Sequence, residues 1–67
     1  MTPAALKIAR TRLGLSQAGL GLALSDPDGD SPPVDGRTVR RWEAGDCRIP
    51  GPAVVAVNYM LAEIEAA

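Results

Sequence analysis

Apolar and polar residues follow each other along this chain with the spacing of short amphipathic helices. Apolar positions recur every three or four residues, the period of one helix face. Residues that break helices separate the periodic segments: Gly14, DPDGDSPP at 26–33, Gly45 and IPGP at 49–52. The pattern predicts an all-α domain with helices at about 3–13, 17–25, 36–45 and 52–65, joined in the middle by an acidic, proline-rich loop at 26–34.

Residues that cap helices stand at three of the predicted starts. The side chains of Thr2, Ser16 and Asp35 can accept hydrogen bonds from the N–H groups of a first helical turn. Gly14 and Gly45 follow the first and third segments, where a glycine favours the end of a helix. Local chemistry and hydrophobic period therefore agree on the same boundaries.

The period also predicts which side chains are buried. The first two helices are expected to bury Leu6, Ala9 and Leu13, and Leu20, Ala23 and Leu24. Gly21 would let its helix approach a neighbour closely. The last helix is apolar on two faces: Val54, Val57, Leu61 and Ile64 form one, and Val55, Tyr59 and Ala62 the other. A helix with two apolar faces usually packs against two partners.

The third helix separates charge from apolar surface. At 100° per residue, Arg37, Arg40 and Arg41 fall within an arc of about 100°, and Val39 and Trp42 point the other way. No acidic residue lies on the cationic side. This face is either a solvated surface or one that meets a polyanion. Arginine suits the second use because its planar fork donates two parallel hydrogen bonds to phosphate or to guanine.

Net charge alone argues weakly against a nucleic-acid partner. The formal net charge is -1 and the isoelectric point is about 5.1. The acidic residues are clustered, however, and without Asp26, Asp28, Asp30, Asp35, Glu63 and Glu65 the remainder is basic.

One cysteine, Cys47, and no histidine exclude an internal disulfide and a Cys/His zinc site. The chain shows no signal peptide and no apolar run that would span a membrane. We expect a cytoplasmic protein in a reducing compartment, with no metal and no cofactor.

The order of these segments resembles a known family. LGLSQAGLGLAL at 13–24, VDGRTVRRWEAG at 34–45 and RIPGPAV at 48–54 are similar to the Cro- and lambda-repressor-like, or XRE-type, helix-turn-helix domains. The resemblance covers roughly residues 4–61. It implies a single domain over 1–67, with four helices or, as in many members, five. It also implies double-stranded DNA as the partner, read in the major groove.

The resemblance assigns roles to particular residues. Arg37 and Arg41 would reach base edges, and Arg40 a base or a phosphate. Gln17, at the start of the second helix, would touch DNA or be an ordinary helix residue. Thr38 would pack, cap or contact phosphate, and Arg48 would contact phosphate or only solvent. In similar proteins the pair that matches Arg10 and Glu43 forms a structural ion pair.

Two features depart from the family. The turn between the second and third helices is normally three or four residues long, and here it is extended by DPDGDSPP. DPDGD resembles the start of a calcium loop, but Ser31 stands where that loop needs glycine and Arg37 where it needs an acid. We therefore expect no calcium. The second departure is that the chain stops after its fourth helix.

The second apolar face of the last helix has two interpretations. Val55, Tyr59, Met60 and Ala62 either complete a small core or form a homodimer interface. The small size of the chain favours a dimer, and two recognition helices related by a twofold axis would read a pseudo-palindromic operator.

We expect a transcriptional repressor that acts by occupying a promoter, in the style of phage, plasmid, antitoxin or anti-CRISPR-associated autoregulators. The alternative is a protein-interaction module that keeps the fold and binds an acidic protein. An enzyme is not expected. The chain has no histidine, and Ser16, Ser25, Ser31 and Cys47 each lack an evident base.

Overall fold

The computed structural model describes residues 1–25 and 34–66. Within them the chain is all α-helical and contains four helices. Their bounds are α1 Pro3–Arg12, α2 Gln17–Leu24, α3 Gly36–Ala44 and α4 Gly51–Ala66. Every boundary lies within one residue of the predicted one. Residues 26–33, which contain the acidic stretch and the rejected calcium motif, lie outside the described residues.

Side-chain caps fix the starts of α1 and α2. Thr2 and Ser16 have extended backbones, and their hydroxyl oxygens accept hydrogen bonds from first-turn N–H groups at 3.0 and 2.9 Å. Gly14 and Gly45 have φ angles of 71° and 82°, which favour glycine because a side chain would be strained there. Each of these two glycines turns the chain just after a helix.

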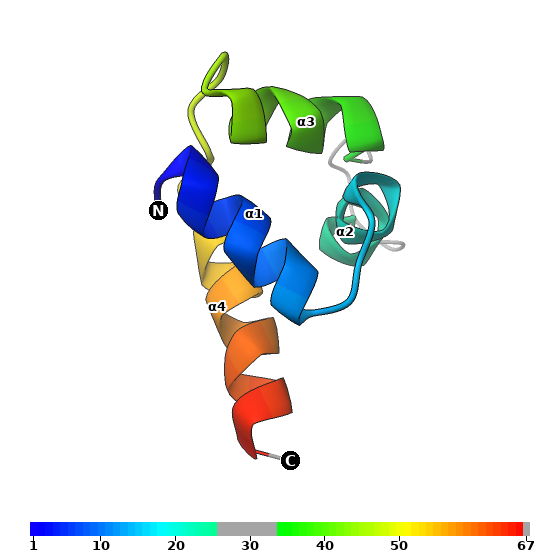
Figure 1. Ribbon diagram of the computed structural model, residues 1–67, viewed down its shortest axis with the longest axis vertical. Coiled ribbons are helices and arrows are strands. Elements are labelled where there is room, and N and C mark those ends of the chain that lie inside the picture. Colours follow the sequence, from blue (N-terminus) through cyan, green and yellow to red (C-terminus); the bar gives the residue numbers. More distant parts are fainter. Residues whose placement is uncertain (26–33, 67) are drawn as a thin grey trace.

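The four helices pack around a single core (Figure 1). α3 lies across one end of the molecule, and α4 runs from beneath α1 to the opposite end, where the chain terminates. α2 packs most extensively against α3, while α1 packs against both α3 and α4. α2 and α3 therefore form one unit that α1 and α4 support.

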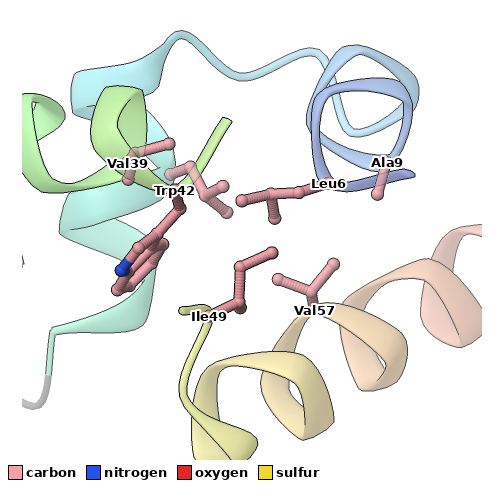
Figure 2. Close-up of a cluster of buried hydrophobic side chains, with 7 residues drawn as sticks. Leu6, Ala9, Val39, Trp42, Ile49 and Val57 are labelled. Carbon is pink, nitrogen blue, oxygen red and sulfur yellow. The ribbon is translucent and has the colours of Figure 1, made fainter. Parts of the chain in front are cut away.

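Seven buried apolar side chains make up the core: Leu6, Ala9, Leu20, Val39, Trp42, Ile49 and Val57. Figure 2 shows six of them converging from α1, α3, α4 and the segment before α4. Val39 is fully buried and Trp42 is 5% exposed, so the apolar side of α3 points inward as its period predicts. This burial fixes the rotation of α3 about its own axis.

The predicted core differs from the observed one at four positions. Leu13 is only half-buried and lies outside the core cluster. Ala23 is exposed, because it faces an open hollow between α2 and α4 instead of the core. Ile64 is 45% exposed, since the last part of α4 extends beyond the other helices (Figure 1). Ile49 is 8% exposed and belongs to the core, although it lies outside any helix and has no periodic neighbours to reveal it.

Candidate nucleic-acid interface

The outer face of α3, which we call the arginine face, is cationic. Arg37, Arg40 and Arg41 are all exposed, on the side opposite Val39 and Trp42. Among the described residues, none of the three arginines makes a salt bridge. Three guanidinium groups that are always charged near neutral pH therefore point into solvent from one helix.

Asp35 holds the first turn of α3. Its carboxylate oxygen Oδ1 accepts hydrogen bonds from the backbone N–H and the hydroxyl of Thr38, both at 2.8 Å. The backbone bond lowers the pKa of Asp35 most, followed by the hydroxyl bond, and the charge of Arg37 adds a smaller effect. Thr38 thus takes part in the cap, one of the roles that the sequence left open for it.

The far end of α3 leads into an exposed turn. Gly45 ends the helix in the left-handed conformation, and its N–H group donates to the last carbonyls of α3. Arg48 and Cys47 follow on the surface. Ile49 then turns inward and joins the core, so the exposed turn after α3 is only a few residues long.

Two glycines bring α2 and α3 into close contact. A Cβ atom at Gly21 would lie 2.6 Å from the carbonyl oxygen of Val34, and one at Gly36 would lie 3.0 Å from the backbone nitrogen of Ala18. The close approach predicted at Gly21 is confirmed, whereas the contact at Gly36 was not predicted from the sequence. The first turn of α2 therefore lies directly beside the first turn of α3.

The chain on either side of residues 26–33 is tied together at Ser25. Its hydroxyl oxygen accepts a hydrogen bond from the backbone N–H of Val34 at 2.9 Å and donates one to the carbonyl oxygen of Gly21 at 2.8 Å. The long connection therefore leaves α2 and returns to α3 at one point. This closure explains how an extended connection is compatible with tight packing of the two helices.

Arg10 and Glu43 form the expected ion pair. Arg10 Nε donates to Glu43 Oε2 at 2.6 Å, and a second guanidinium nitrogen donates to Oε1 at 3.2 Å. A third donates to the carbonyl oxygen of Leu15 at 3.0 Å, after α1 ends. The side chains of Arg10 and Glu43 are 15% and 7% exposed, so the pair is largely shielded from water. It joins α1 to α3 and fixes the turn before α2.

Gln17 joins the same cluster. Its amide nitrogen donates to Glu43 Oε1 at 3.3 Å, and its side chain is half-buried. Glu43 thus accepts hydrogen bonds from α1 and from the start of α2. This bond could not be predicted from the sequence, because residues that are far apart in the chain make it. Whether Gln17 also reaches DNA stays a prediction.

The pKa of Glu43 reflects opposing influences. Burial has the largest single effect and raises it, but hydrogen bonds from Arg10 and Gln17, with the charges of Arg10 and Lys7, outweigh burial. The pKa of Glu43 is therefore lowered. The pKa of Arg10 is raised, chiefly by its hydrogen bond to Glu43. Both groups are charged at neutral pH, and the carboxylate belongs to this cluster instead of neutralising the arginine face.

The second predicted site lies on α4. Val55 and Tyr59 are 69% and 66% exposed, and Ala62 is exposed as well. Met60 is half-buried and packs against the core, as the first of the two interpretations expects for it.

No protein-family model matches the chain, and no curated protein or solved structure shows significant similarity to it. Over residues 1–25 and 34–66, no cluster of three or more acidic or cysteine side chains could hold a metal ion. Every helix in that part of the chain is too short or too polar to cross a bilayer.

Proposed function

We propose that this protein is a sequence-specific, double-stranded DNA-binding transcriptional regulator, in which α2 and α3 form a helix-turn-helix of the lambda-repressor-like kind. One observation carries the proposal: Arg37, Arg40 and Arg41 project from one exposed face, unpaired among the described residues, while Val39 and Trp42 anchor the opposite face. A helix is about 10–12 Å across with its side chains and fits a major groove about 12 Å wide.

The arginines would have different partners. Arg37 and Arg41 lie one turn apart, and we assign them to base edges, where a guanidinium can bind the O6 and N7 of guanine. Arg40 lies three residues before Glu43, the residue of α3 that Gln17 contacts, and we assign it to a base or a phosphate. Arg48, exposed beyond α3, would contact phosphate.

The acidic sequence between the helices would limit non-specific binding. DNA repels aspartates, so these residues would weaken the attraction of the chain for duplex of any sequence. Binding would then depend more on the specific contacts of Arg37, Arg40 and Arg41. We favour repression, because a domain that covers a promoter excludes polymerase without any further contact.

Fluorescence anisotropy on random-sequence duplex DNA, measured at increasing salt, tests DNA binding. Each neutralised phosphate releases counterions, so the logarithm of the association constant should fall linearly with the logarithm of salt concentration. Selection from a random duplex pool would then define the operator and the symmetry of its half-sites. A chain that binds no duplex even at low salt would overturn the proposal.

An acidic protein is the second candidate partner. The formal net charge of -1 favours it over DNA, because the chain as a whole has no net attraction for a long polyanion. The same arginine face would bind carboxylates, for which Arg is also suited. Absence of binding to every duplex, together with retention on an acidic polypeptide that Arg41→Ala abolishes, would favour this alternative.

A further inference from the structure

α2 and α4 together form an apolar surface that neither helix would form alone. Its residues are Ala23 of α2 and Pro52, Val55, Ala56, Tyr59 and Met60 of α4, and they line one open hollow. We call this surface the α2/α4 face. Large exposed apolar side chains that gather around a hollow are typical of an interaction site. Burial of Val55 and Tyr59, which are about two-thirds exposed, would provide much of the driving force.

The distribution of charge on α4 indicates what covers this face. From Gly51 to Ala62 the helix has no charged residue, and its only charges, Glu63 and Glu65, come at its C-terminal end. Glu65 is paired with Arg12 at 2.9 Å. A face without charge can meet an identical face with no repulsion, as a twofold interface requires.

The same charges select the direction of pairing. If two α4 helices cross near Ala56 in antiparallel directions, Glu63 of each copy lies opposite the first turn of the other, near Gly51. That turn is the positive end of the helix dipole and favours a carboxylate. Parallel pairing would instead place the two Glu63 side chains against each other. The face is thus complementary in charge to a second copy in the antiparallel arrangement.

We propose that a second copy of this chain packs on the α2/α4 face, with the two α4 helices antiparallel and Glu63 of each copy beside the start of the other α4. The dimer itself is independent of DNA. Its role rests on the proposed function: a twofold dimer would present two α3 faces to half-sites about 34 Å apart in successive major grooves.

Sedimentation equilibrium of the full chain without DNA tests the dimer. Wild type should associate at micromolar concentrations, and Val55→Lys should weaken association by roughly tenfold or more, because it buries an unpaired charge. Ile8→Lys is the matched control: Ile8 is 61% exposed on α1, outside the face, and its variant should dimerise like wild type. Circular dichroism should show both variants folded. A wild-type chain that stays monomeric throughout the micromolar range would overturn the proposal, and the face would then belong to another partner.

Disulfide trapping tests the antiparallel direction. In a Cys47→Ser background, Val55→Cys lies near the twofold axis and should give a covalent dimer on mild oxidation. Glu63→Cys lies at opposite ends of the interface in the two copies and should not. Efficient trapping through Glu63→Cys would show parallel pairing and contradict the proposed geometry.

The two proposals fail in different ways. A chain that dimerises but binds no duplex would refute DNA recognition and leave the α2/α4 interface intact. A chain that binds duplex as a monomer at every concentration would refute the interface and leave DNA recognition intact.

Discussion

The carboxylate of Glu43 lies 2.6 Å from Nε of Arg10 and joins the third helix to the first. The cationic face and this ion pair belong to the same helix but serve different purposes. The arginines on the outside have no acidic partner among the described residues, while the one acid of α3 is held by α1 and α2. The helix can therefore be anchored by charge without losing charge from its exposed face.

This pair should make stability depend on pH. The pKa of Glu43 is lowered in the folded protein, so its contribution to the free energy of unfolding is complete above about pH 4.5, the ordinary pKa of the group. The contribution is lost as pH falls through the lower pKa of the folded state. Urea denaturation between pH 7 and 3 should show a steeper acid loss for wild type than for Glu43→Gln. Equal pH dependence in the two proteins would contradict this assignment.

Trp42 should be indispensable to folding. It is 5% exposed, and Trp42→Ala removes its buried ring from the core, at a cost of about 3–5 kcal/mol in the free energy of unfolding. A small domain has little more stability than that, so the variant should be largely unfolded at room temperature. Leu22→Ala, which truncates an apolar side chain that is 76% exposed, should melt like wild type. A Trp42→Ala variant with normal melting would mean that α3 is rotated differently.

Because α2 lies so close to α3, we predict that a single methyl group added at Gly21 destabilises the folded protein. Gly21→Ala places a Cβ atom 2.6 Å from a backbone oxygen, which cannot move as a flexible side chain would. We expect a loss of about 1–3 kcal/mol, although alanine is the better helix residue. Gly51→Ala is the control, because nothing lies within 4 Å of its Cβ position. Thermal melts should show that variant unchanged or more stable, and a stabilised Gly21→Ala would contradict the packing.

Substitutions on the arginine face should distinguish contacts with bases from contacts with phosphates. Arg37→Ala and Arg41→Ala should each cost about 1–3 kcal/mol on the selected operator and relax specificity at one base pair if they read base edges. Arg12→Ala removes one positive charge from an exposed ion pair between α1 and α4 and controls for net charge. Fluorescence anisotropy should compare the affinity of each protein variant for the operator with its affinity for duplexes of altered sequence. A loss of equal size on every sequence would assign that arginine to phosphate.

The order, length and type of the helices could be predicted from the sequence. Caps at Thr2, Ser16 and Asp35 and the glycines after α1 and α3 act within one or two turns, so neighbouring residues contain the information. The rotation of α3 could also be predicted, since its apolar and cationic residues occupy opposite faces.

Only the tertiary structure decided how these helices use their surfaces. Ile49 belongs to the core although it lies outside any helix, and Ala23 lines a hollow shared with α4. Gly36 allows the first turn of α2 to pack closely against α3, because it has no side chain. Gln17 donates to Glu43 because α1, α2 and α3 meet there. A helical period reports which side of one helix is apolar, and it contains no information on which neighbour, if any, covers that side. Contacts between distant segments depend on how the helices pack together, and that packing placed these four residues.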